Sequence, residues 1–160
     1  MTVTTRIDEV RNEITALAQA APTAKDLMQG VCKLLHDSML KYSWVGFYML
    51  EAGAQPPALV LDAFVGAMTP HMRIPLNQGI CGAAASSGKT VVVDDVSKDP
   101  RYLACSLETK SEIVVPIFVK NQVAGELDVD SHFSAAFGAE DQKLVQYCAE
   151  VVGKKLEKAR

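Results

Sequence analysis

The feature that most constrains the fold is a change in hydrophobic period along the chain. Apolar residues recur at helical spacing near both ends, whereas the central segments alternate or are rich in aromatic and β-branched residues. In GELDVDS, Glu126, Asp128 and Asp130 occupy one face of an extended segment, while Leu127 and Val129 occupy the other. We therefore predict an α+β fold with a central, mostly antiparallel sheet flanked by N- and C-terminal helices.

The periodicity also places the individual elements. Helical spacing predicts an N-terminal helix over about residues 5–20, a second helix from Thr23 or Asp26, and a final helix from about Ala139 to the end. A short helix is expected in GICGAAASSG, and the preceding RIPLNQG is read as a loop. Strands are expected in WVGFYML, PALVLDAFVG, TVVVDDV, EIVVPIFV and VAGELDVDS, the last two forming a hairpin joined by Lys120, Asn121 and Gln122.

Length and charge narrow the class of protein. A chain of 160 residues fits one domain, here residues 1–160 with a core of about 25–155. The formal net charge of −3 gives no basic excess for nucleic acid, and the basic end, KKLEKAR, is read as a solvated helix face. No apolar run is long enough for a membrane span and the N-terminus does not resemble a signal peptide, so a cytoplasmic protein is expected.

The four cysteines are widely spaced and form no CxxC pair. In a reducing compartment this spacing predicts neither a disulfide framework nor a zinc site. Cys32 and Cys148 lie within helical apolar patterns and are expected to pack in the core. Cys81 lies at the start of a small-residue helix, where free N–H groups would lower the pKa of its thiol, or where a small residue is needed for packing.

Cys105 follows RYLA and precedes SLETK, so it lies in a polar loop and is a candidate nucleophile. The carboxylates Glu112, Asp128 and Asp130 are each read as solvated unless they face the Trp44 and Tyr48 side of the strand WVGFYML. The three histidines form no metal-ligand pattern, and there is no phosphate-binding glycine motif. The sequence thus predicts no metal site and no cofactor.

Several segments together resemble one known family. The segments RIPLNQGICG, VVDDVSKDP, LACSLETKSEIVVPIF and GELDVDS, with WVGFY upstream, are similar to the free methionine-(R)-sulfoxide reductases, which are single GAF domains. The resemblance covers roughly residues 25–155. It implies a GAF fold and an oxidoreductase that reduces free methionine sulfoxide.

The resemblance also implies roles for individual residues. Cys105 matches the catalytic cysteine and Cys81 a second family cysteine, while Trp44 and Tyr48 match the aromatic wall of the pocket. The matching acids are substrate-binding and acid residues, for which we expect Asp128 as the proton donor and Glu112 with Asp130 as ligands of the substrate ammonium group.

One departure from the family concerns recycling of the oxidised enzyme. The family has a further cysteine shortly before RIP, where this chain has His71 in PHMRIP. The implied mechanism converts Cys105 to a sulfenic acid as methionine leaves. A disulfide with Cys81, reduced by thioredoxin, or another external thiol would then restore it.

Two other functions are compatible with the same residues. A non-catalytic GAF sensor would bind a small ligand and signal to a partner, and the missing cysteine favours that reading. A thiol redox sensor would form a Cys81–Cys105 disulfide without a substrate, which leaves the acids unexplained. The apolar faces of the terminal helices further suggest a homodimer.

Overall fold

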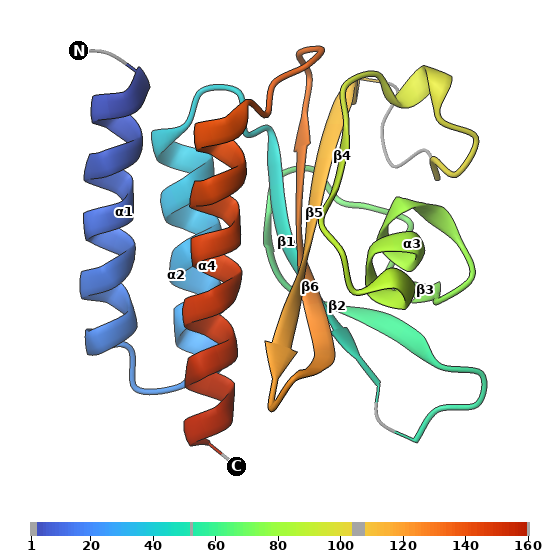
Figure 1. The fold of residues 1–160 in the computed structure, drawn as a ribbon, viewed down its shortest axis with the longest axis horizontal. Helices are drawn as coiled ribbons and strands as arrows, with labels where there is room; N and C mark the ends of the chain where they lie inside the picture. Colours follow the sequence, from blue (N-terminus) through green and yellow to red (C-terminus); the bar gives the residue numbers. More distant parts are fainter. Residues whose placement is uncertain (1–2, 52, 104–107, 160) are drawn as a thin grey trace.

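The computed structural model describes residues 3–51, 53–103 and 108–159. Within these ranges the chain forms four α-helices, six β-strands and one short 3₁₀ helix, η1 (Figure 1). In chain order the elements are α1 (Val3–Ala20), α2 (Ala24–Ser38), β1 (Trp44–Leu50), β2 (Ala58–Val65), β3 (Arg73–Pro75), α3 (Gly79–Ser87), β4 (Val91–Val93), η1 (Val96–Lys98), β5 (Ser111–Val119), β6 (Gln122–Ser131) and α4 (Ala139–Lys158). None of the helices in these ranges has the length and apolar character that crossing a membrane requires.

The six described strands form one antiparallel sheet in the order β3-β2-β1-β6-β5-β4. Helices α2 and α4 cover one face of this sheet, α1 packs against the outer side of α2 and α4, and α3 lies on the other face of the sheet (Figure 1). The first and last helices of the chain therefore lie together, although the whole sheet separates them in sequence. This arrangement confirms the predicted α+β class and the flanking terminal helices.

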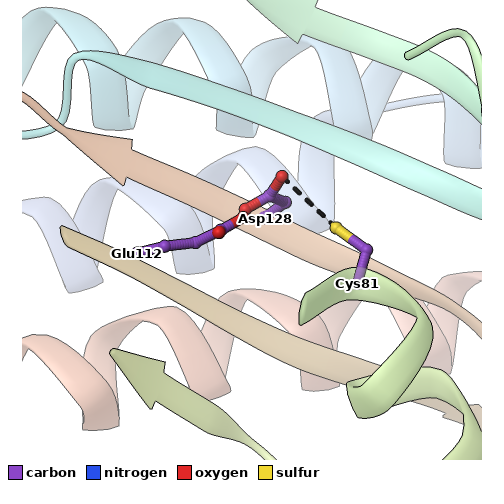
Figure 2. Close-up of side chains that lie close together, drawn as sticks. All are labelled: Cys81, Glu112 and Asp128. Carbon is purple, nitrogen blue, oxygen red and sulfur yellow. Dashed lines mark hydrogen bonds between the residues drawn. The ribbon is translucent and has the colours of Figure 1, made fainter. Parts of the chain in front are cut away.

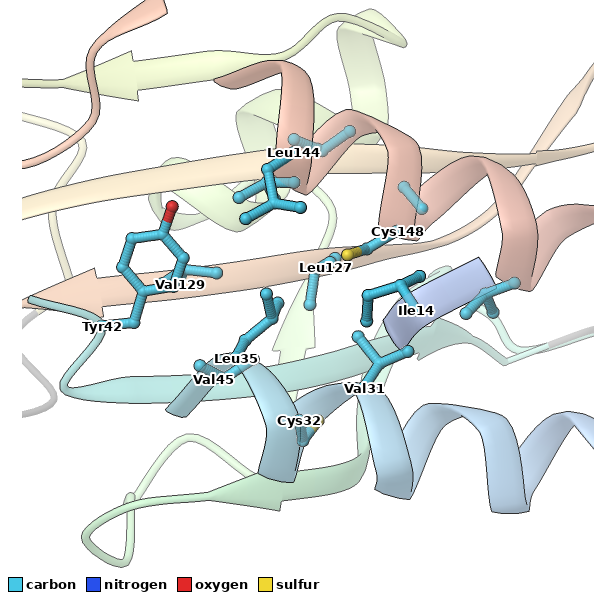
Figure 3. Packing of buried hydrophobic residues seen from close by; sticks show 14 of the residues in the cluster. Ile14, Val31, Cys32, Leu35, Tyr42, Val45, Leu127, Val129, Leu144 and Cys148 are labelled. Atoms are coloured by element: carbon cyan, nitrogen blue, oxygen red, sulfur yellow. The ribbon is translucent and has the colours of Figure 1, made fainter. Parts of the chain in front are cut away.

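The larger core lies between the sheet and the three long helices. Leu127 and Val129 project from β6 toward Ile14 of α1, Val31 of α2 and Leu144 of α4, and all five side chains are fully buried (Figure 3). These residues are the apolar half of the alternation in β6, which the sequence placed on one face. The opposite face of β6 is therefore turned toward α3.

The predicted core positions of two cysteines are confirmed. Cys32 and Cys148 are fully buried in the larger core, and the Cys32 thiol donates to the carbonyl of Ala63 at 3.6 Å. Both are free thiols, as is Cys81. Burial raises the pKa of the Cys148 thiol to about 12, so this cysteine behaves as a small apolar residue.

A smaller core lies between the sheet and α3. It contains Trp44, Tyr48 and Val114 from the sheet and Ile80 and Cys81 from the helix. Helix α3 begins at Gly79, whose φ of +71° is in the left-handed region that favours glycine. The short side chains that follow let this helix pack close to the strands.

Two local predictions were wrong. RIP is not a loop: it forms edge strand β3, in which Ile74 pairs with Leu59 and is buried. Three residues are too few to show a period of two, so this strand has no periodic signal in the sequence. The hairpin turn is also shorter than predicted, because Gln122 already pairs with Val119 and only Lys120 and Asn121 lie between the strands, both with positive φ.

Candidate active site

The site is built on the face of β6 that points away from the larger core. Across the β1–β6 ladder, Trp44 pairs with Asp130 and Tyr48 pairs with Glu126, while Asp128 lies opposite Gly46. The acidic face of β6 and the aromatic face of β1 are therefore the same face of the sheet. The acids thus face the Trp44 and Tyr48 side of β1, which is the arrangement under which the sequence predicts a functional role for them.

Glu112 joins this cluster from the neighbouring strand. It pairs with Asp130 across β5 and β6, and Val114, two residues further on, pairs with Asp128. Glu112 therefore projects from the same face as Asp128, opposite to Ile113, as the alternation in β5 predicts.

Four carboxyl groups are buried at this site, on the face that they share with Trp44 and Tyr48. Glu112, Glu126, Asp128 and Asp130 are all 5% exposed or less. No Lys, Arg or His of the described ranges forms an ion pair with any of them. Both carboxyl oxygens of Glu126 and one each of Asp128 and Asp130 are buried without a described hydrogen-bond partner. Such groups favour a ligand that brings positive charge or donors.

Burial and mutual repulsion govern the protonation of the cluster. Burial raises the pKa of Glu112 well above its usual range, and the charges of Asp128 and Asp130 raise it further. Burial also raises the pKa of Asp128, although hydrogen bonds with Glu112 and Cys81 oppose that shift. The cluster therefore retains protons that solvated carboxyl groups would have lost, and it can supply one to a bound ligand.

Cys81 is the residue of α3 whose side chain contacts the acid cluster. Its Sγ donates to Oδ2 of Asp128 at 3.5 Å, with Glu112 beside them (Figure 2). Burial raises the pKa of this thiol well above its usual range, and the charges of Asp128, Glu126 and Glu112 raise it further. The expected lowering by the helix N-terminus was wrong, because desolvation and nearby carboxyl groups outweigh the partial charge of the helix.

Trp44 and Tyr48 form the aromatic part of the site. The Trp44 indole N–H donates to the carbonyl of Ala67 at 3.0 Å, and its ring stacks on Phe64 at a centroid distance of 5.8 Å. The Tyr48 hydroxyl donates to the carbonyl of His71 at 2.8 Å. Both ring positions are thus fixed by hydrogen bonds to backbone carbonyls on the segment between β2 and β3.

Two cavities lie along this face. The first has a volume of about 20 Å³ and is lined by Tyr48, His71, Cys81, Glu112 and Asp128, with Ile74, Gly79, Ile80 and Leu103. The second has a volume of about 90 Å³, and its lining includes the side chains Trp44, Met68, Glu108, Asp130 and His132. The acids of β6 therefore open onto both cavities, Asp128 onto the first and Asp130 onto the second.

The predicted site residues that the structure describes lie around the two cavities. Cys81, Glu112, Asp128 and Tyr48 all line the smaller cavity, and Trp44 and Asp130 line the larger one. Cys105, the predicted nucleophile, lies outside the described residues. Glu126 is a further buried acid of this face that is not among the predicted site residues, although its position in the alternation of β6 indicates it.

Comparisons with known proteins identify the family of this chain. A GAF domain match spans residues 23–156. The free methionine-R-sulfoxide reductase of Escherichia coli (strain K12) is 32% identical over 135 residues, which are 84% of this chain and 79% of that protein.

Two solved structures extend the comparison. A free methionine-R-sulfoxide reductase from Neisseria meningitidis in complex with its substrate has a TM-score of 0.92 at 32% identity, over 100% of this chain and 93% of that chain. A type II free methionine-R-sulfoxide reductase from Thermoplasma acidophilum has a TM-score of 0.78 at 39% identity, over 89% of this chain and 96% of that chain. The chain therefore belongs to the GAF domain family and, within it, to the free methionine-R-sulfoxide reductases.

Proposed function

We propose that this protein reduces free L-methionine-(R)-sulfoxide to methionine. The observation that carries the proposal is the set of four buried acids on one sheet face with Trp44 and Tyr48. Relatives with this fold are named for the same activity, and one was solved in complex with its substrate. A free amino acid has the ammonium group that such a cluster can bind.

The two cavities support a placement for this substrate. Glu112 and Asp130 bind the ammonium group, and the apolar part of the side chain packs against Trp44 and Tyr48. A cavity of about 20 Å³ holds little more than one water molecule, so the substrate extends into the second cavity of about 90 Å³. Selectivity for a free amino acid follows, because a peptide-bonded methionine lacks the ammonium group.

The proposed chemistry begins at Cys105. Its thiolate attacks the sulfoxide sulfur while Asp128, which retains its proton in the buried cluster, protonates the sulfoxide oxygen. The oxygen is transferred, methionine leaves, and Cys105 becomes a sulfenic acid. Leu103 and Glu108, the described residues on either side of residues 104–107, line the smaller and the larger cavity respectively, which supports this assignment.

Cys81 is the proposed partner for recycling. Its thiol attacks the Cys105 sulfenic acid, forming a disulfide and releasing water, and thioredoxin or another thiol then reduces the disulfide. The thiol must lose its proton for this step. Asp128, 3.5 Å away and ionised after the first step, is placed to accept it.

Three further properties belong to this proposal. The protein works in the cytoplasm, uses thioredoxin or a similar thiol, and forms a homodimer. The apolar face of α1 on which a dimer was expected is not available for one, since Ile7, Val10 and Ile14 are buried against this chain's own α2 and α4.

A coupled assay tests the proposal. The protein is given thioredoxin, thioredoxin reductase and NADPH with free L-methionine-(R)-sulfoxide, and NADPH oxidation is followed alongside methionine formation. We expect turnover of the (R) epimer and none of the (S) epimer. Saturable binding without turnover would instead support the sensor, which the replacement of the family cysteine by His71 favours.

A further inference from the structure

Three side chains from different elements converge on one point of the smaller cavity. Cys81 of α3, Glu112 of β5 and Asp128 of β6 each offer one sulfur or oxygen atom, and these atoms all lie within 4.8 Å of one another. Figure 2 shows the two carboxyl groups side by side, with the Cys81 sulfur directed at Asp128. All three residues are 5% exposed or less.

The separation of two of these atoms fits a tetrahedral metal site. Zinc bonds of about 2.3 Å to sulfur and about 2.0 Å to oxygen, at a tetrahedral angle, separate the two ligand atoms by about 3.5 Å. The distance between Cys81 Sγ and Asp128 Oδ2 is 3.5 Å. Only the Glu112 carboxylate has to move inward to occupy a third corner.

Two independent observations indicate that this point accommodates a cation. Asp128 is 2% exposed, lines the cavity, and has one carboxyl oxygen with no described partner. The cavity of about 20 Å³ beside these ligand atoms has room for the one water that would complete the coordination of an ion held between them. The unpartnered oxygen is Oδ1, on the same carboxyl group whose Oδ2 accepts from the Cys81 thiol, so this buried group has an open ligand position and no described positive charge beside it.

We propose that Cys81, Glu112 and Asp128 form a Zn²⁺ site, with water in the fourth position. The sulfur ligand and the small number of ligands favour Zn²⁺ over Mg²⁺ or Ca²⁺, which take six or more oxygen ligands. The sequence-based expectation of no metal site considered spacing along the chain, and these ligands come from separate elements. The proposal replaces that expectation.

Metal in this position blocks substrate. Zn²⁺ would occupy Glu112 and Asp128, the groups that bind and protonate the sulfoxide, so reduction stops until the metal is removed. This consequence rests on the proposed function, whereas metal binding itself does not. Zn²⁺ is thus a reversible inhibitor of the metal-free enzyme rather than its cofactor.

Cobalt provides a spectroscopic test of the site. Co²⁺ is titrated into the reduced, metal-free protein, and the near-ultraviolet charge-transfer band of a cobalt–thiolate bond is recorded with the visible bands of tetrahedral cobalt. We expect one Co²⁺ per chain, displaced by Zn²⁺. Cys81→Ser should abolish the charge-transfer band, and Asp128→Asn should weaken binding at least about tenfold.

Two variants serve as matched controls. Asp130→Asn changes a buried acid of the same strand that is not a ligand, and Cys105→Ser removes the thiol of the predicted nucleophile; both should keep the band. Circular dichroism checks that each variant is folded. The proposed metal site would be overturned if the wild type showed no charge-transfer band. It would also be overturned if the band survived in Cys81→Ser or was lost in Cys105→Ser.

Single-turnover reactions separate this inference from the proposed function. Reduced protein, freed of reductant, is mixed with the (R)-sulfoxide with and without Zn²⁺, and methionine is measured. If methionine forms only in the absence of Zn²⁺, both the reductase activity and the metal site are supported. If methionine forms but the cobalt titration gives no charge-transfer band, the metal site alone is overturned. A cobalt band with no methionine in metal-free protein overturns the reductase and leaves the metal site standing.

Discussion

Gly46 lies beneath the ring of Trp44: a Cβ atom at position 46 would stand 2.3 Å from Cη2 of the indole. No real Cβ approaches another atom so closely, so the ring and any larger side chain at position 46 exclude each other. Glycine in the middle of β1 is therefore what allows Trp44 to lie flat along the strand, beside Asp130.

The first prediction follows from this contact. Gly46→Ala should displace the Trp44 ring, raise KM for the sulfoxide at least about tenfold, and destabilise the fold by about 1–3 kcal/mol through overpacking. Steady-state kinetics and urea unfolding measure both effects. Gly138→Ala is the control, because a Cβ there would approach no closer than 3.7 Å to its neighbour. An unchanged KM in Gly46→Ala would show that the ring position is not needed for binding.

The second prediction separates the roles of two acids. Asp128→Asn removes the proton donor and should lower kcat by about 10²–10⁴-fold. Glu112→Gln removes an ammonium ligand and should act mainly on KM. Asp62→Asn, a partly exposed acid on β2 paired with Lys25, should change neither constant. If Asp128→Asn raised KM and spared kcat, Asp128 would be a binding group and another residue would be the acid.

The third prediction concerns stability and pH. Burial raises the pKa of Glu126 well above its usual range, so the folded chain holds its proton at pH values where the unfolded chain has released it. The protonated Glu126 side chain contributes its full stabilisation below about pH 4, the ordinary pKa of a glutamate in the unfolded chain. This stabilisation is lost as the pH rises through the pKa of Glu126 in the folded chain. Glu126→Gln removes this dependence and should be more stable than wild type at pH 8 by at least about 1 kcal/mol.

Urea unfolding at pH 4 and pH 8 measures this difference, which should disappear at the lower pH. Glu150→Gln, an exposed change next to Lys154 on α4, should stay within about 0.5 kcal/mol of wild type at both values. A Glu126→Gln variant that is less stable than wild type at pH 8 would mean that the carboxylate is paired in the folded protein.

The fourth prediction tests recycling. Cys81→Ser should leave methionine formation intact in a single turnover but slow steady-state turnover with thioredoxin, which needs the disulfide. Dithiothreitol, which attacks the sulfenic acid directly, should restore turnover. Cys32→Ala, a buried thiol of the larger core, should leave turnover unchanged with either reductant. Normal turnover of Cys81→Ser with thioredoxin would exclude Cys81 from recycling.

The faces of the strands and the hairpin of β5 and β6 were predictable, whereas the pairing of β6 with β1 was not. A period of two assigns Glu126, Asp128 and Asp130 to one face whatever lies beside them. That β6 pairs with β1 in the register joining Asp130 to Trp44 depends on contacts between distant segments, which have no local signal. The burial of the acids follows from that pairing and from α3, so it too was beyond the sequence.

Cys81 illustrates the same limit within the site. The sequence shows that it begins a helix, and from that alone a lowered pKa is a reasonable expectation. The groups that raise the pKa instead are Asp128, Glu126 and Glu112, which come from β5 and β6. Local sequence cannot give the electrostatics of a site assembled from three separate elements.

The most direct test of the account is a single-turnover measurement of methionine. Reduced wild-type protein and Cys105→Ser, both without external reductant or metal, are mixed with excess L-methionine-(R)-sulfoxide, and methionine is quantified by chromatography. We predict a burst of about one methionine per chain for wild type and none for Cys105→Ser. No methionine from folded wild-type protein, or an equal burst from Cys105→Ser, would contradict the account.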